Sequence, residues 1–240
     1  MHYAFSLEFL DISKGRQIPS TISGDDKNKF SKATKVEMEL ETYMKITFVI
    51  LIAMILTAIG YAQRKAQKLH GSRFAQSANE VQWLLWIRAL IGIPLWIVMI
   101  GWFTSGNWIP WAYLSLPIWA RWSGVMLAGL VSFLFWWIHL TLGSNYHGAM
   151  GLHEHHQLVT NGPYRFVRHP TYVAFPLATI AIFLLSANWL LGLLGFTVTL
   201  TISLNRAPIE EQKLLERFGE QYQTYSARTG RFFPRLFKDS

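Results

Sequence analysis

Residues 156–172 read His-Gln-Leu-Val-Thr-Asn-Gly-Pro-Tyr-Arg-Phe-Val-Arg-His-Pro-Thr-Tyr and lie between two long apolar blocks. Proline fixes its own φ and disfavours the helical region for the residue before it, so the pairs Gly162-Pro163 and His169-Pro170 predict two bends. Taken alone, the two arginines would indicate an ordinary basic loop after a membrane helix. A twice-bent segment rich in hydrogen-bonding side chains is better suited to wrapping a polar ligand.

The composition of the chain indicates a membrane protein. Hydrophobic residues make up 51% of it and charged residues 15%, against roughly 25% charged in a soluble domain. Eleven tryptophans occur in 240 residues, and many flank apolar blocks, where an indole suits the headgroup level. The absence of cysteine excludes disulfides and thiolate metal ligands. The net charge is +8, and the basic residues border apolar spans. This placement favours contact with membrane lipids over contact with nucleic acid.

Three apolar segments predict one transmembrane helix each: 46–62, 83–103 and 122–142. Each has about the length needed to cross a hydrocarbon core of roughly 30 Å at 1.5 Å per residue. Pro94 predicts a kink in the second segment. His139 is the only titratable group of the third, and we interpret it as a packing residue rather than a catalytic one.

A fourth apolar segment, residues 173–204, carries no charge. As one helix it would be about 48 Å long, more than a bilayer needs. Ser186-Ala-Asn188 supplies a turn near its middle, so the segment predicts a helical hairpin with both ends on one side of the membrane. This arrangement would bring residues 168–172 and 206–211 together.

We therefore expect an all-α integral membrane bundle of five transmembrane helices. Residues 1–45 form a mixed-charge lead predicted to be poorly ordered or loosely helical, and residues 46–142 form the first three helices. Residues 143–240 form a core that contains the stretch 156–172, here termed the motif loop, then the hairpin and an amphipathic tail. Basic residues follow the first span and populate the tail, whereas the loop 104–118 has none. By the positive-inside rule, the motif loop and the C-terminus are cytoplasmic and the N-terminus lies on the opposite side.

The tail is predicted to begin a new helix at Arg206-Ala-Pro208, because proline is tolerated in the first helical turn. Glu210 and Glu211 would then lie in that first turn, where the helix dipole favours acidic side chains. Such a capping role would by itself account for both glutamates, and it stays an alternative to a functional role.

Three pieces of sequence occur in a fixed order. They are His156-x-Leu158-Val159-Thr160-x-Gly162-Pro163-Tyr164, then Arg168-His169-Pro170-x-Tyr172, then Arg206 with Glu210-Glu211. Together they resemble the isoprenylcysteine carboxyl methyltransferase family and the related phospholipid methyltransferases, which are integral membrane enzymes that use S-adenosylmethionine. The resemblance covers residues 122–236.

The resemblance implies a cofactor pocket, a substrate-facing arginine and two further catalytic residues. The implied pocket residues are His156, Gln157, Leu158, Val159, Gly162, Tyr164, His169, Pro170, Thr171, Tyr172 and Glu210. Arg206 would face the substrate, Arg168 would brace the pocket, and Glu211 would serve as a base where the acceptor needs one. A helix-end contact is an equally simple explanation for Arg168.

The identity of the methyl acceptor decides which of these groups is needed. Arg206 could hold a carboxylate by a bidentate pair, and no general base would be required. An amine or a thiol would need a base, either Glu211 or a histidine. We expect methylation of a prenylcysteine-like carboxylate on a lipophilic or lipidated substrate. The alternatives are a phospholipid amine N-methyltransferase, a small-thiol S-methyltransferase, a sterol-reductase-like protein and a purely structural membrane protein.

A histidine-rich run precedes the motif loop and could be mistaken for a metal site. Its members are His147, His153, Glu154, His155 and His156. A metal site usually draws ligands from more than one segment, and no second cluster occurs in the sequence. We therefore predict that no metal is bound.

Overall fold

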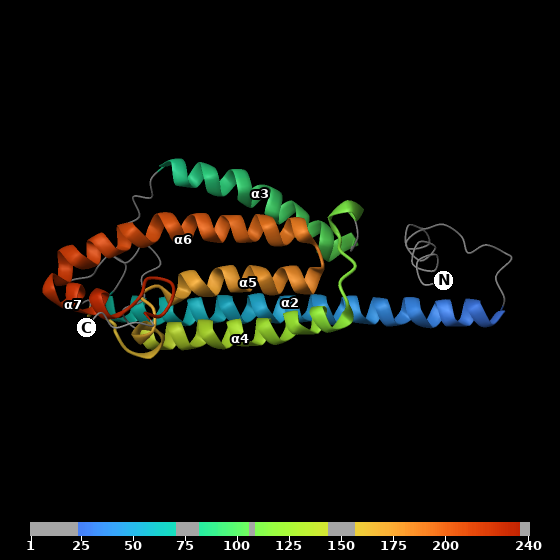
Figure 1. Ribbon diagram of the computed structural model, residues 1–240, viewed down its shortest axis with the longest axis horizontal. Helices are drawn as coiled ribbons and strands as arrows, with labels where there is room; N and C mark the ends of the chain where they lie inside the picture. The colour runs from blue at the N-terminus through green and yellow to red at the C-terminus, as the bar shows by residue number, and fades with distance from the viewer. Residues whose placement is uncertain (1–23, 71–81, 106–108, 144–156, 236–240) are drawn as a thin grey trace. The chain divides into compact units, whose positions relative to one another are not determined.

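The computed structural model describes residues 24–70, 82–105, 109–143 and 157–235. The described helices are α2 (Gly24–His70), α3 (Gln82–Ser105), η2 (Pro110–Ala112), α4 (Ile118–Leu142), η4 (Gly162–Arg165), α5 (Pro170–Ser186), α6 (Trp189–Phe218) and α7 (Glu220–Arg228) (Figure 1). Within these ranges the only β pairing consists of two isolated bridges, so the all-α prediction is confirmed. The chain divides into two compact units, Met1–Tyr43 and Met44–Ser240.

Five of the described helices contain an apolar stretch that could lie within a membrane. Three are long enough to cross one: the stretch Ser31–Lys65 of α2, α4 and α6. Two shorter apolar helices, Leu90–Thr104 within α3 and α5, complete the set. Large apolar side chains such as Trp96 and Leu130 are exposed on their outer faces, as lipid-facing side chains are. The predicted multi-pass membrane protein is confirmed.

Helix α2 begins well before the predicted first span. The part of the lead from Gly24 onward is a regular helix, continuous with the apolar stretch that starts at Ile46. This stretch contains no proline, and Lys29 pairs with Asp25 at 2.6 Å across one helical turn. The helix therefore continues through the charged residues instead of ending at the membrane boundary.

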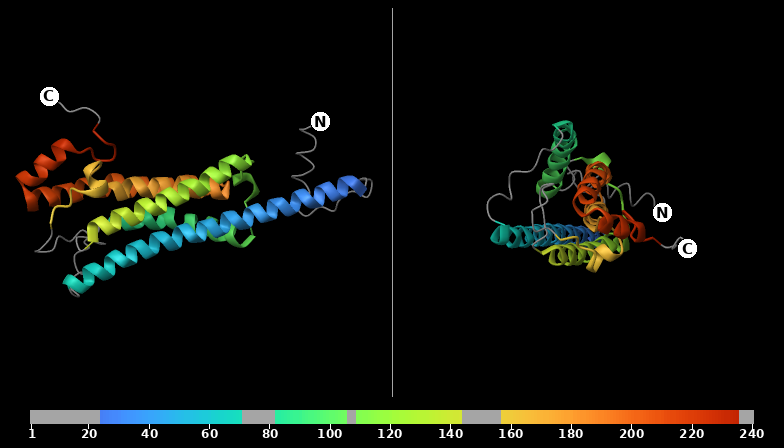
Figure 2. Two further views of the ribbon diagram at one scale, coloured as in Figure 1. Left: turned by 90° about the horizontal axis from the view of Figure 1, so that it is seen from below. Right: turned by 90° about the vertical axis from the view of Figure 1, so that its left-hand side faces the viewer.

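The predicted hairpin is present as α5 and α6. Ala187 joins the two helices in the left-handed conformation, with φ of 51°. Asn188 caps α6, because its side-chain oxygen accepts a hydrogen bond from the Leu191 amide at 2.9 Å. Arg121 of α4 donates to the carbonyl of Leu185 at 2.5 Å. Its positive charge thereby offsets the partial negative charge at the C-terminal end of α5. Helix α5 packs between α4 and α6 (Figures 1 and 2).

The predicted start of a tail helix at Arg206 is wrong. Helix α6 continues without a break from Trp189 to Phe218 and contains Pro208 in its interior. Proline has a helical φ and removes only one backbone donor, so a long helix can absorb it. The break falls instead at Gly219, whose φ is 51°. Glu210 and Glu211 are therefore far from the first turn, and helix capping does not account for them.

His139 lies at the inner face of α4. It is 1% exposed, its Nδ1 is 2.7 Å from the carbonyl oxygen of Phe135, and its ring stacks on that of Phe135 at 5.9 Å. These contacts agree with the packing role inferred from the sequence.

Small residues allow α4 and α5 to approach closely. A Cβ atom placed on Gly124 would lie 2.7 Å from Cβ of Leu184 and 3.1 Å from the backbone nitrogen of Leu185. Membrane helices associate through such close backbone packing, because lipid supplies little hydrophobic drive between them. Gly129 on the same helix meets nothing within 4 Å of the same construction.

We expect Gly124→Ala to destabilise the bundle by about 1–3 kcal/mol, because the added methyl group overpacks the α4–α5 contact. Gly129→Ala is the matched control. It should leave stability unchanged or raise it by up to about 1 kcal/mol through helix propensity. Thermal unfolding in detergent measures both, and equal melting temperatures for the two variants would contradict this packing.

Candidate active site

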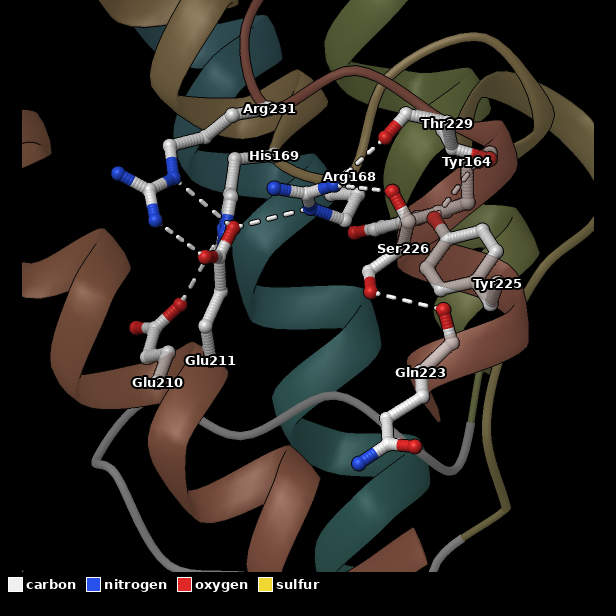
Figure 3. A network of polar contacts seen from close by, with 10 residues as sticks. All are labelled: Tyr164, Arg168, His169, Glu210, Glu211, Gln223, Tyr225, Ser226, Thr229 and Arg231. Carbon is white, nitrogen blue, oxygen red and sulfur yellow. Dashed lines mark hydrogen bonds and ion pairs between the residues drawn. The ribbon is translucent and has the colours of Figure 1, made fainter. Parts of the chain in front are cut away.

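Three segments distant in sequence meet where α5 begins. They are the motif loop before α5, the polar end of α6, and residues 229–235 after α7, here termed the C-terminal strap (Figure 3). The strap binds the motif loop through its backbone, because the Arg168 amide donates to the Gly230 carbonyl at 2.8 Å and the His169 amide to the Arg231 carbonyl at 3.1 Å. The hairpin thus brings together the two sequence blocks that it was predicted to join.

The carboxylate of Glu211 is the centre of this meeting point. Its Oε1 lies 3.0 Å from Nε of Arg168, 3.1 Å from Nε2 of His169 and 3.0 Å from Nε of Arg231. Its Oε2 accepts a second bond from Arg231 at 2.5 Å. The side chain of Glu211 is only 13% exposed. One carboxylate therefore links α6, the motif loop and the strap.

These contacts keep Glu211 ionised. Glu211 lies beyond the apolar segment 173–204, in the charged C-terminal part of α6. Burial would raise its pKa, but hydrogen bonds from His169, Arg231 and Arg168 outweigh burial and hold the pKa well below its usual range. The same pairing raises the pKa of Arg231. A carboxylate held this firmly is a poor proton acceptor, because protonation would break charge-assisted bonds.

Arg168 acts as a brace. Besides Glu211, its guanidinium donates from Nη1 to the carbonyls of Ser226 at 2.7 Å and Thr229 at 2.6 Å. These carbonyls belong to the end of α7 and the start of the strap. The side chain is 15% exposed, so its donors serve the protein and fix the base of the strap to the motif loop.

Glu210 has different surroundings from its neighbour. Its Oε1 accepts a hydrogen bond from the Tyr172 hydroxyl at 2.5 Å, and its Oε2 lies 3.7 Å from Nδ1 of His169. The rings of His169 and Tyr172 stack at 5.4 Å with 18° between their planes. The Glu210 side chain remains 33% exposed. A partly accessible carboxylate beside two aromatic faces is suited to a cationic ligand.

The other predicted site residues vary in how closely they approach this centre. Arg206 is half-buried one helical turn before Glu210, and its charge acts on Tyr172. The Tyr164 carbonyl accepts a bond from the Tyr225 hydroxyl at 2.7 Å. Gly162 has φ of 56° and faces Thr141, which leaves no room for a side chain.

The remaining predicted pocket residues form a separate group. Pro170 opens α5 and is buried, whereas Thr171, Leu158 and Val159 are half-buried and Gln157 is exposed. Of the predicted set, Arg168, His169 and Tyr172 contact Glu210 or Glu211 directly. His156 and the rest of the histidine-rich run lie outside the described residues.

Sequence reasoning missed two strap residues. Arg231 makes the outer ion pair with Glu211, and the Phe232 ring lies 6.0 Å from the ring of His169. The available signal was the run Arg-Phe-Phe-Pro at 231–234, a basic and aromatic segment directly after an amphipathic helix. Such a run indicates that the segment packs against the rest of the protein, but it does not indicate which carboxylate the arginine pairs with.

The fold and the site define an integral membrane helical protein with a polar, cation-compatible site at the end of a helical hairpin. Residues 124–216 match the family model described as the isoprenylcysteine carboxyl methyltransferase (ICMT) family, so this segment is similar to members of that family. The segment contains most of α4, all of α5 and most of α6, including both glutamates.

Two curated proteins with related names are similar to this chain in sequence. Protein-S-isoprenylcysteine O-methyltransferase B of Arabidopsis thaliana is 35% identical over 75 residues, which cover 31% of this chain and 38% of that protein. The Mus musculus protein-S-isoprenylcysteine O-methyltransferase is 29% identical over 128 residues, covering 52% and 45%. The chain thus spans less than half the length of these curated relatives.

A solved structure shares the fold. The eukaryotic intramembrane Ras methyltransferase ICMT, determined without a monobody, aligns with a TM-score of 0.52 and 21% sequence identity, covering 82% of this chain and 72% of that one. At this identity the likeness supports the helical membrane architecture alone.

The burial of the two arginines predicts unequal costs of removing them. Arg168→Gln should lower the free energy of unfolding by about 3 kcal/mol, because it leaves a buried carboxylate short of a partner. Arg231 is 44% exposed, so Arg231→Gln should cost at most about 1 kcal/mol. Denaturant unfolding of both variants, with exposed Arg228→Gln as control, measures the difference. Equal losses for Arg168 and Arg231 would contradict the assigned burial.

The lowered pKa of Glu211 predicts a pH dependence. A carboxyl with a depressed folded-state pKa contributes stability that is fully present above its unfolded pKa of about 4.3 and is lost as pH falls through the folded-state value. The stability difference between the wild type and Glu211→Gln should therefore be constant from pH 8 to about pH 5 and shrink below about pH 4. Unfolding measured across this range tests it, and a difference that shrinks near neutrality would show that Glu211 is not held in this way.

Proposed function

We propose that this protein is an S-adenosylmethionine-dependent methyltransferase that methylates the carboxylate of a prenylcysteine-like, lipidated acceptor. One observation carries the proposal: inside the family-matched segment, the Glu210 carboxylate lies beside the stacked rings of His169 and Tyr172. The names of the curated relatives support the same acceptor class.

The site residues fit a cationic cofactor. Glu210 would hold the positive charge of S-adenosylmethionine, and the His169 and Tyr172 rings would offer aromatic faces to it. When bound, this cofactor supplies a methyl group on a cationic sulfur. The nucleophile attacks the methyl carbon and displaces the sulfur. The protein's task is then to align the acceptor with that group and to exclude water. Phe232 of the strap covers His169 and would help to exclude it.

The state of Glu211 favours a carboxylate acceptor. An amine or a thiol loses a proton on methylation and needs a base nearby, whereas a carboxylate does not. Glu211 was the first candidate for that base, but three cationic or hydrogen-bonding partners occupy it and lower its pKa. Nε2 of His169 is engaged by the same carboxylate. Both groups are therefore better explained as supports of the site than as proton acceptors.

Arg206 is the residue that we assign to the acceptor carboxylate. Arg168 and Arg231 are committed to Glu211. Arg206 lies on α6 one turn before Glu210, and its charge reaches Tyr172, so it borders the proposed cofactor position. A guanidinium can bind a carboxylate through two parallel hydrogen bonds, which orient one carboxylate oxygen for attack.

The orientation of the chain follows from the basic residues that border the spans. With five spans, the site and the C-terminus would lie on the cytoplasmic side and the N-terminus on the other. The acceptor would enter sideways from the membrane, because a prenyl chain partitions into lipid.

The proposal is tested with S-adenosylmethionine carrying a labelled methyl group. The purified protein is offered S-farnesylcysteine, phosphatidylethanolamine or a small thiol. Label should appear in farnesylcysteine and be released as methanol by mild alkali, because only a methyl ester is cleaved so readily. Alkali-stable label in phosphatidylethanolamine or in the thiol, with none in farnesylcysteine, would overturn the carboxylate assignment.

Arg206 and Glu210 should fail in different ways when changed. Arg206→Ala should leave cofactor affinity nearly intact and lower turnover by about 2–4 kcal/mol of transition-state stabilisation, with little rescue by Arg206→Lys. Glu210→Gln should instead weaken cofactor binding, because it removes the negative charge near a cation. Cofactor affinity and single-turnover rate measure the two effects. Exposed Glu216→Gln on the same helix is the control, and wild-type values for Arg206→Ala and Glu210→Gln would remove both assignments.

A further inference from the structure

A continuous ladder of rings runs from the outer face of α4 to the motif loop. Phe133 and Trp137 are both exposed on α4, with ring centroids 6.2 Å apart. The Trp137 ring meets that of Phe166 edge-on at 6.5 Å, and Phe166 is itself 43% exposed. The Arg165 guanidinium lies over the Phe166 ring at 4.5 Å. The ladder therefore leads from a lipid-facing surface to a cation.

The ladder places Arg165 at the membrane boundary. Helix α4 is long and apolar enough to cross a bilayer, so the exposed Phe133 and Trp137 face lipid. Trp137 lies near the end of α4, at the level where an indole meets the headgroups. Arg165 belongs to the short helix η4 and is exposed. Its aliphatic part and the Phe166 ring continue the apolar surface while the charge reaches water.

A second cation lies at the same end of α4. Lys65 of α2 is exposed, and its Nζ would be 3.4 Å from a Cβ atom on Gly143, the residue that caps α4. The Tyr61 ring of α2 lies 6.2 Å from the Trp136 ring of α4. Neither Lys65 nor Arg165 makes an ion pair with a carboxylate in the part of the chain that the structure describes.

We propose that Arg165 binds the phosphate of an anionic membrane lipid and that Lys65 adds positive charge at the same end of α4. Both cations lie at the C-terminal end of α4, one reached through the aromatic ladder and one through α2. With the Phe166 ring on one side of it, the guanidinium can offer two of its N–H donors to a phosphate. The lipid chains lie along the exposed Phe133 and Trp137.

This surface has a consequence for the neighbouring site. Arg165 and Phe166 directly follow Tyr164, whose carbonyl accepts a hydrogen bond from Tyr225, and only Val167 separates them from Arg168. A lipid bound at Arg165 therefore fixes the outer edge of the loop that carries the brace of the candidate active site. The lipid surface does not depend on the proposed methyl transfer and is tested without it.

The test uses the full chain in nanodiscs of phosphatidylcholine containing a minor fraction of phosphatidylglycerol. Bound lipids are counted by native mass spectrometry after release of the protein. The wild type should retain phosphatidylglycerol in excess of its share of the bilayer. Arg165→Gln and Lys65→Gln should each lower this preference about fivefold, as expected for one cation near a charged surface. Arg228→Gln, which removes an exposed arginine of α7, should leave it unchanged.

Two further variants separate the site from net charge. Arg165→Lys keeps the charge but not the planar fork, so it should retain only part of the preference. Phe166→Ala keeps both cations but removes the platform under Arg165, and it should lower the preference as well. A wild type without preference would overturn the proposal, as would an equal loss for Arg228→Gln and Arg165→Gln.

Discussion

The site depends on a single carboxylate shared by three donors. Glu211 receives Arg168 and His169 from the motif loop and Arg231 from the strap, and it is itself held on α6. A buried charge is stable only when it is paired, so these partners must assemble together. The close contact of α4 with α5 at Gly124 and the cap at Asn188 fix the far end of the hairpin. The charged end is then assembled where the hairpin places it.

Two adjacent glutamates have separate tasks because of helix geometry. Successive residues on an α-helix point about 100° apart. Glu211 therefore reaches Arg168 and Arg231, while Glu210 reaches Tyr172 and stays partly open to solvent. The Glu211 carboxylate is engaged in structural contacts between α6, the motif loop and the strap. The Glu210 carboxylate remains partly exposed beside two aromatic rings.

The sequence predicted the helical hairpin because an uncharged segment much longer than a bilayer needs must turn back. It predicted the meeting of the two motif blocks for the same reason. The prediction from the sequence was wrong where a local residue pattern pointed to a different structure. Pro208 resembled a helix start, but the preceding helix simply continued through it. The fate of Glu211 was also hidden, because its decisive partner Arg231 lies twenty residues away and depends on the break at Gly219.

The proposed cofactor site joins the motif loop to the polar end of α6. Amide hydrogen exchange with and without saturating S-adenosylmethionine tests this most directly. Residues 157–172 and 206–211 should gain protection together, while the hairpin turn at 185–189 should not change. Protection confined to other regions, or none at cofactor concentrations in the millimolar range, would contradict it.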